Sequence, residues 1–454
     1  MEKNLLDKKI YFKTLISLAL PIIIQNLISN SLNMVDTMMI GGLGKTELAA
    51  VGLANQFFFL YSLITFGINS GCAIYISQFW GKRDIENIRK VLGLCILIGG
   101  SIGFVFTIVA LIFPESIMGF FTKDREVLVK GVEYLRIVSL SYILTTLSFC
   151  YAFASRSIGM AYVPMITSFI ALGCNTIFNF ILIYGKLGAP ALGVKGAAIA
   201  TVISRIIEFV LIISIIYFSK GVLAAKINEM FNLKKEFILK VLRTIYPVVL
   251  NEFFWALGIT MYSVAYARIG TDAVASVQIS NTIQNIFMVA AFGLANSCAI
   301  MIGNEIGAGK EKNAMILAKR FIKISFSIGI ILGITIFFSN KTIISIFSIV
   351  DAKVIADTSI ILKLFSMIIP VKMLTSLFIV GILRSGGDTR FSLFLEIGSV
   401  WGIGVPLAFI GAAFLKFPVY IVVAMIYFEE VVKLILVLPR FKSKKWIRNL
   451  VDNI

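Results

Sequence analysis

The chain has 454 residues, of which 59% are hydrophobic and only 15% charged, whereas soluble domains average about 45–50% and about 25%. Apolar runs of about 18 or more residues recur along its length, which excludes a soluble globular fold and predicts a polytopic membrane protein. The lack of histidine excludes His metal sites, His proton relays and Ser-His catalysis. The net charge of +18 comes from alternate loops, which is typical of membrane orientation rather than nucleic-acid binding.

We predict twelve spans, preceded by a short charged segment at residues 1–13. The first apolar run is too long for a signal-peptide core and lacks a small-residue cleavage site, so we expect it to remain as a span. The spans are roughly 14–40, 50–79, 91–113, 130–155, 162–184, 194–218, 241–267, 274–303, 316–338, 357–383, 391–413 and 417–439.

The distribution of lysine and arginine predicts the orientation. The N-terminus, the even-numbered loops and the C-terminus hold roughly 27 of these residues, and the odd-numbered loops about 12. Both termini are therefore expected in the cytoplasm, with the protein in the inner (plasma) membrane. A polar linker at 219–240 divides an N-terminal six-helix lobe, 14–218, from a C-terminal lobe, 241–439, and a basic tail follows at 440–454.

The first span carries one acid, Asp36, among several neutral polar residues. A carboxylate inside a membrane costs several kcal/mol unless it faces water or a partner, which marks a functional site by default. We interpret Asp36 as a proton or cation site. The alternative is an acid at the membrane edge, because Gly41 and Gly42 follow shortly.

The two halves of the chain repeat each other. Pro21 matches Pro247, 226 positions later, and no gap is needed as far as Gly81 and Gly307. Two halves with an even number of spans share one topology, so an axis along the membrane normal relates them and places a substrate path at their interface. This is the architecture of a secondary transporter that works by alternating access, and no Walker A motif suggests ATP as the driving force. Further pairs at the same offset are Gly44 with Gly270, Ala49 with Ala275, Asn55 with Asn281 and Cys72 with Cys298.

Several motifs in this order resemble the multidrug and toxic compound extrusion family over nearly the whole chain. They are the Asn33 to Thr37 run, Leu48-Ala-Ala-Val51, residues 188–201 (GAPALGVKGAAIAT), and Leu383 to Thr389 (LRSGGDT). The resemblance implies two six-helix lobes in a V shape that expel organic cations in exchange for sodium ions or protons.

The resemblance also implies a polar ion site in the N-terminal lobe. Asp36 matches the acid of the family's first span, and Asn175 matches an asparagine of its fifth span. Asn179 stands where some relatives carry aspartate, and Thr201 in the sixth span is a further member. One carboxylate with neutral oxygens suits a proton or a hard cation such as sodium.

The C-terminal lobe offers a second candidate cation or substrate site. Glu252 resembles an acid that some relatives use for cation binding, but Lys372 occupies the span where they place the second acid. Glu396 is an alternative partner for Glu252, and either acid is a candidate to pair with Lys372. We expect structural roles for Arg205 with Glu208 and for Glu429 or Glu430 with Lys433, because each set is spaced i, i+3 or i, i+4 on one helix.

We therefore predict a cation-coupled multidrug antiporter. No cofactor is expected, and no metal beyond a possible Na⁺; the coupling ion is Na⁺ or H⁺. We expect a monomer that contacts membrane lipid and small organic cations, and no nucleic acid. The alternative is a flippase for a lipid-linked oligosaccharide or cell-envelope precursor, which would need a cationic cavity for phosphates. A channel would not need coupled acids, and no catalytic constellation supports an enzyme. The five cysteines form no CxxC pair, so neither a metal site nor a disulfide framework is expected.

Overall fold

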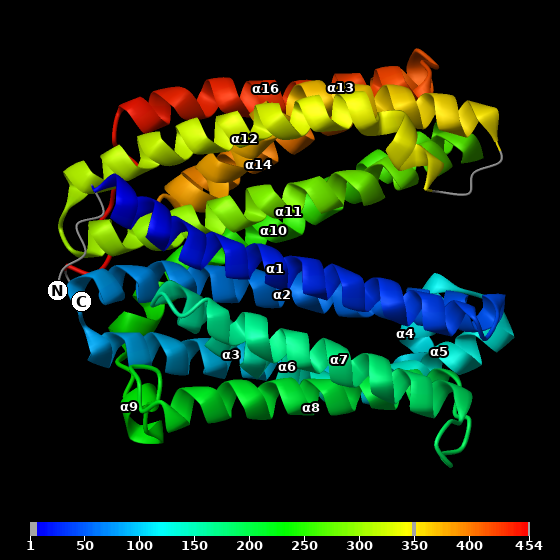
Figure 1. Ribbon diagram of the computed structural model, residues 1–454, viewed down its shortest axis with the longest axis horizontal. Helices are drawn as coiled ribbons and strands as arrows, with labels where there is room; N and C mark the ends of the chain where they lie inside the picture. Colours follow the sequence, from blue (N-terminus) through cyan, green and yellow to red (C-terminus); the bar gives the residue numbers. More distant parts are fainter. Residues whose placement is uncertain (1–6, 347–350, 453–454) are drawn as a thin grey trace. The chain divides into compact units, whose positions relative to one another are not determined.

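The computed structural model describes residues 7–346 and 351–452, which are almost wholly helical (Figure 1). Residues 1–6, 347–350 and 453–454 of the predicted terminal segments and loop lie outside the described residues, as does the side chain of Asn33. Within the described ranges, eleven helical segments have the length and composition to cross a membrane. A twelfth long helix, α16, carries Glu429, Glu430 and Lys433 in its middle. The predicted all-helical, twelve-span class is confirmed.

The first half contains six long helical segments and two short helices. The spans are α1 (Lys8–Gly41), α2 (Lys45–Lys82), α3 (Ile85–Ile112), α5 to α6 (Arg125–Val138, η1 Ser139–Ser141, Tyr142–Ser157), α7 (Tyr162–Tyr184) and α8 (Val194–Phe218). The short helices are α4 (Pro114–Phe121) and α9 (Ile227–Phe231).

The second half repeats the long segments, with more irregular geometry near its end. They are α10 (Lys235–Ile269), α11 (Thr271–Gly307), α12 (Glu311–Ser345), α13 (Ala352–Ser376) with the π-helix η2 (Leu377–Leu383), and α16 (Val419–Lys442). The eleventh span alternates between α14 (Thr389–Ser399), η3 (Val400–Gly404), α15 (Val405–Phe409) and η4 (Ile410–Phe414), of which η3 and η4 are π-helices.

The internal repeat is visible in the backbone at the turn before the second helix of each half. Gly44 precedes α2 with φ 150° and ψ 171°, and Gly270 precedes α11 with φ 148° and ψ 173°. This conformation is almost exclusive to glycine, because any Cβ would be strained there. The matched helix starts, Lys45 with Thr271 and Ile85 with Glu311, keep the sequence offset of 226.

The chain forms two compact units, Leu20–Ile245 and Tyr246–Ile454 together with the residues up to Ala19. We call them the N-terminal unit and the C-terminal unit. Each division falls inside a helix, α1 or α10, directly before the segment that contains Pro21 or Pro247. A proline removes a backbone hydrogen bond within a helix, so both helices have a natural bending point at the division.

The predicted linker belongs structurally to the N-terminal unit. Arg89 of α3 forms an ion pair with Glu229 of α9 at 2.9 Å, and its Nε donates to the carbonyl of Val222. Gly93 of α3 lies so close to the Met230 carbonyl that a Cβ would overlap it. The linker therefore packs onto the helices that precede it.

Each unit has its own apolar core, and aromatic rings are prominent in both. In the N-terminal unit Tyr61 and Tyr142 stack with ring centroids 4.9 Å apart and contact Phe58. In the C-terminal unit Tyr262 and Tyr266 of α10 pack with buried aliphatic residues of α13, α16 and the eleventh span. The polar sites below lie beside these cores.

Candidate ion and transport sites

Asp36 lies near the end of α1 and is half-buried. Its Oδ1 accepts a hydrogen bond from Nδ2 of Asn179 on α7 at 2.5 Å. The same amide nitrogen donates to Oδ1 of Asn175, one turn earlier, at 2.9 Å. The structure thus brings together three of the four residues predicted for the N-terminal ion site.

The asparagine pair has a fixed orientation. Asn175 and Asn179 are almost fully buried, and the two amide hydrogens of Asn179 are both used. Its Oδ1 is a buried oxygen without a hydrogen-bond partner among the described groups. A buried oxygen of this kind beside a carboxylate is a ligand that a hard cation prefers.

Thr201 lies on α8 and faces the same space as Asp36. Its hydroxyl donates to the backbone carbonyl of Ala197 at 3.0 Å. Both residues line a cavity of about 360 Å³ inside the N-terminal unit, together with Asn55, Phe58 and Phe59. The cavity is therefore part polar and part aromatic, which suits an organic cation.

A second polar chain runs behind the cavity. Arg205, which also lines the cavity, forms the predicted i, i+3 ion pair with Glu208 at 2.6 Å. Glu208 accepts from Ser168, Gln25 donates to Ser168, and Arg156 donates to Gln25 at 2.5 Å. The cavity's arginine is thus neutralised by an acid of its own helix, which leaves Asp36 as the acid exposed to the cavity.

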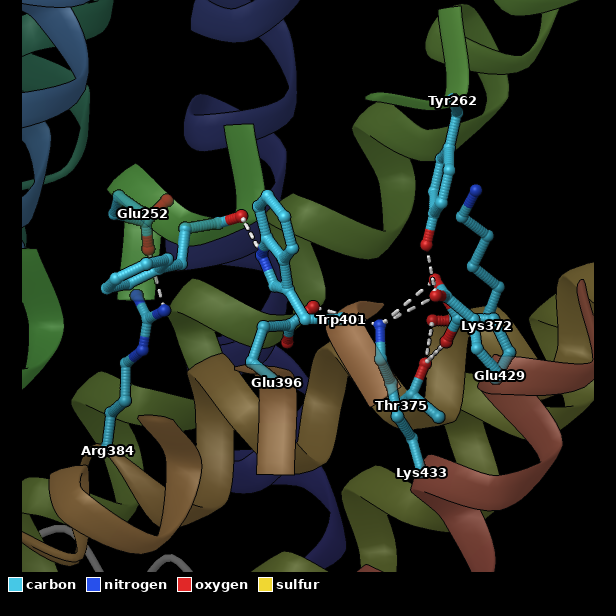
Figure 2. A network of polar contacts seen from close by, with 11 residues as sticks. Glu252, Tyr262, Lys372, Thr375, Arg384, Glu396, Trp401, Glu429 and Lys433 are labelled. Carbon is cyan, nitrogen blue, oxygen red and sulfur yellow. Dashed lines mark hydrogen bonds and ion pairs between the residues drawn. The ribbon is translucent and has the colours of Figure 1, made fainter. Parts of the chain in front are cut away.

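The three C-terminal candidates, Glu252, Glu396 and Lys372, contact different partners. Glu252 of α10 is paired with Arg384 at 2.6 Å (Figure 2), a partner that the spacing of the sequence did not suggest. The alternatives in which Glu252 pairs with Glu396 or Lys372 are therefore wrong. The Arg384 side chain is 3% exposed and that of Glu252 is 13% exposed. The charge of Glu252 is therefore neutralised by a buried arginine.

Glu396 instead belongs to a cluster around Lys433. The Lys433 ammonium lies 2.9 Å from Glu396 and 3.4 Å from Glu429 (Figure 2). It lies 3.7 Å from Glu430. The contacts with Glu429 and Glu430 agree with the predicted local pairing on α16. We call Glu396, Glu429, Glu430, Lys433 and their hydroxyl partners Tyr262 and Thr375 the Lys433 cluster.

Lys372 of α13 has a different environment. Its Nζ lies 5.8 Å from the ring centroid of Phe365 and 5.7 Å from that of Tyr427. Within the described ranges, no carboxylate lies at ion-pair distance from it. The expectation that Lys372 neutralises Glu252 or Glu396 is thus wrong, because Arg384 and Lys433 occupy those positions.

These features together define a class of protein. A membrane protein of twelve long helices in two matching halves, with a carboxylate that lines a cavity inside one half, has the build of a secondary transporter. The MatE family model matches residues 21–181 and 247–410, one stretch in each half. The chain therefore belongs to the MatE family, the multidrug and toxic compound extrusion transporters.

Relatives match over nearly their whole length. A probable multidrug resistance protein NorM of Thermotoga maritima is 24% identical over 452 residues, covering 97% of this chain and 94% of the relative. An uncharacterized transporter of Bacillus subtilis, YisQ, is 25% identical over 442 residues, covering 96% and 95%.

Solved structures share the fold at similar coverage. A MOP superfamily transporter from Pyrococcus furiosus superposes with a TM-score of 0.85 at 22% identity, covering 95% of this chain and 96% of that one. A MATE crystal structure in complex with MaL6 gives a TM-score of 0.87 at 20% identity, covering 95% and 97%. The predicted architecture is therefore that of solved MATE structures.

Proposed function

We propose that this protein is a secondary active multidrug efflux antiporter that exports organic cations in exchange for Na⁺ or H⁺ by alternating access. The family membership and the relatives described as multidrug resistance proteins support efflux. The observation that supports coupling is the hydrogen bond from Asn179 to Asp36, which lines a cavity among the candidate membrane-spanning helices.

Asp36 is the group whose charge changes. As a free carboxylate it attracts a cationic substrate into the cavity, and with a bound proton or sodium ion it no longer does so. A ligand shifts a conformational equilibrium only by its differential affinity for the two states. Competition for one carboxylate supplies that difference, since ion binding weakens the hold on the substrate and favours its release outside.

Asn175, Asn179 and Thr201 shape the ion site. Sodium would be held by Asp36 with the unpartnered Oδ1 of Asn179, while a proton would need Asp36 alone. Asn175 fixes the amide of Asn179 and so keeps its donor directed at the carboxylate. Thr201 contributes a hydroxyl to the cavity wall.

We further propose a location in the plasma membrane with both termini in the cytoplasm. The support is the excess of lysine and arginine in the N-terminal segment, the even-numbered loops and the tail. In this proposal the protein is a transporter and not an enzyme. Transport needs no cofactor other than the coupling ion.

The test is efflux of a fluorescent organic cation in everted vesicles, under a sodium gradient and a proton gradient imposed separately. We expect the parent to transport under one of them and Asp36→Asn to lose that transport. The gradient that drives the parent identifies the ion. Glu133→Gln is the matched control, because Glu133 is a partly exposed acid of the same unit that pairs with Lys195 at 3.2 Å; it should transport normally.

Equal transport by Asp36→Asn and the parent would overturn the role of Asp36 and direct attention to the acids of the C-terminal unit. A parent that transports under neither gradient would contradict the antiporter proposal and favour the lipid-linked substrate of a flippase.

A further inference from the structure

The Lys433 cluster is buried and contains more acidic than basic side chains. The side chains of Glu396 and Glu429 are each 7% exposed, that of Glu430 is 10% and that of Lys433 is 3%. Three carboxyl groups surround one ammonium, and the next cation, Lys372, contacts rings rather than carboxylates. Even if Lys372 is counted, the carboxyl groups outnumber the lysines by one.

In the part of the chain that the structure describes, the other groups that contact the cluster do not supply the missing positive charge. Tyr262 of α10 donates its hydroxyl to Glu429, and Thr375 of α13 donates to Glu430 at 2.5 Å. Tyr266 follows Tyr262 one turn later on α10, and Tyr427 of α16 donates to Gln284 of α11 at 3.1 Å. These groups are all neutral, so the packed elements leave one uncompensated carboxylate if every acid is ionised.

Like-charged carboxylates in a buried site do not all ionise, because each charge opposes the next and burial weakens the screening by solvent. We infer that the Lys433 cluster is a proton-binding site in the C-terminal unit, in which Glu396, Glu429 and Glu430 share one exchangeable proton. The proton comes from water and returns to water, and no other bond is made or broken.

The geometry selects a proton over a metal cation. The Lys433 ammonium already lies within 3.7 Å of all three carboxyl groups, where a sodium ion would have to sit. A fixed positive charge at that point repels a second one. Among the described residues, no lysine ammonium contacts Asp36, and the arginine of its cavity, Arg205, is paired with Glu208. The two sites therefore differ in the ions they accept.

This inference goes beyond the proposed function, because proton binding can be measured on protein that transports nothing. The probe is infrared difference spectroscopy of the purified full-length protein in lipid nanodiscs, following the carbonyl stretch of protonated carboxyl groups between neutral and alkaline pH. All variants are made in Asp36→Asn, which removes the carboxyl group of the proposed N-terminal ion site; the buried acids Glu208 and Asp388 are paired with arginines. Exposed carboxyl groups are ionised at neutral pH and do not contribute.

The Asp36→Asn protein should show a carboxyl band that titrates away at alkaline pH. Glu396→Gln, Glu429→Gln and Glu430→Gln should each abolish it, since two carboxylates then face two lysines. Glu252→Gln is the matched control and should keep the band, because Glu252 is ion-paired with Arg384 and lies outside the Lys433 cluster.

In Lys372→Met we expect a stronger carboxyl band rather than a weaker one. A stronger band cannot be explained by a variant that simply fails to fold. The substitution should enlarge the band, because three acids then face one lysine. Three outcomes would overturn the inference. The band could be missing in the Asp36→Asn protein, it could be unchanged in all three glutamine variants of the cluster, or it could be lost in Glu252→Gln. Transport by the parent can fail or succeed independently of these results.

Discussion

At the scale of single residues, Gly404 shows how closely the Lys433 cluster is packed. It ends the π-helix η3, and a Cβ at this position would overlap the Tyr262 hydroxyl and Glu429 Oε2. The hydrogen-bonded side chains of Tyr262 and Glu429 thus occupy the space that a side chain at residue 404 would need.

Gly404→Ala should therefore destabilise the protein by about 1–3 kcal/mol, as overpacking a core does. The measurement is the free energy of unfolding by denaturing-detergent titration. Gly402→Ala, in the same π-helix, is the control, since nothing lies within 4 Å of a Cβ there. Equal stability of the two variants would contradict the packing that the structure shows.

Sequence predicted those charge contacts that lie within one helix. The pairs Arg205 with Glu208 and Glu429 or Glu430 with Lys433 follow from helical spacing, because side chains three or four residues apart share a face. The pairs of Glu252 with Arg384 and of Glu396 with Lys433 join different spans. Their spacing carries no signal, so only the tertiary packing identifies them. Arg156 and Arg384 occupy matching places in the two halves, 228 residues apart, but this match does not identify the partner of either arginine.

At the scale of elements, the apolar runs located the spans closely, but helix ends extend beyond them. The predicted spans 162–184 and 194–218 coincide with α7 and α8, whereas the predicted 50–79 became Lys45–Lys82. Polar residues continue a helix into the interface, where hydropathy gives no boundary. The π-helices of the eleventh span had no sequence signal either, because they depend on how α14 and α15 pack.

The turns at Gly44 and Gly270 give a prediction about the repeated elements. Nothing lies within 4 Å of a Cβ at Gly270, so Gly270→Ala is strained by its backbone alone. We expect a loss of about 1–3 kcal/mol in the free energy of unfolding. Gly173→Ala in α7, which is also unobstructed and does not have the positive φ, should be neutral or slightly stabilising. A neutral Gly270→Ala would show that this conformation is not required.

The segment after α16 is a second element with a defined role. Trp446 is fully buried, stacks on Phe441 with centroids 5.9 Å apart, and follows α16 in a turn. Asp388, in the motif before α14, binds Arg440 at 2.6 Å and Arg448 at 2.9 Å. The basic tail is thus packed onto the C-terminal unit, which explains the acid of the LRSGGDT motif.

Trp446→Ala should release this segment and cost about 3–5 kcal/mol, the usual loss for a buried aromatic ring. Limited proteolysis should then cleave the tail faster than in the parent. Lys445→Ala removes an exposed neighbour and should leave the cleavage rate unchanged. Equal cleavage of Trp446→Ala and the parent would mean that the ring does not anchor the tail.

At the scale of the whole molecule, the two units use one repeated arginine differently. Arg156 donates to the neutral amide of Gln25 at 2.5 Å, whereas Arg384 donates to the carboxylate of Glu252 at 2.6 Å. At the offset of 226 residues Glu252 aligns with Asn26, but the residue that makes the corresponding contact with arginine is Gln25. The repeat therefore preserved the position of the contact and changed its charge.

This difference predicts unequal responses to the same substitution. Arg384→Gln leaves a mostly buried carboxylate without its cation, which should cost about 3–5 kcal/mol, and Arg156→Gln, whose partner is neutral, about 1–3 kcal/mol. Unfolding in denaturing detergent measures both. The double variant Arg384→Gln with Glu252→Gln should recover much of the loss, because two amides can bond where the charges were. If the double variant is no more stable than Arg384→Gln, the cost lies in lost packing of the arginine rather than in an unpaired charge, and the two units differ in shape rather than in electrostatics at this position.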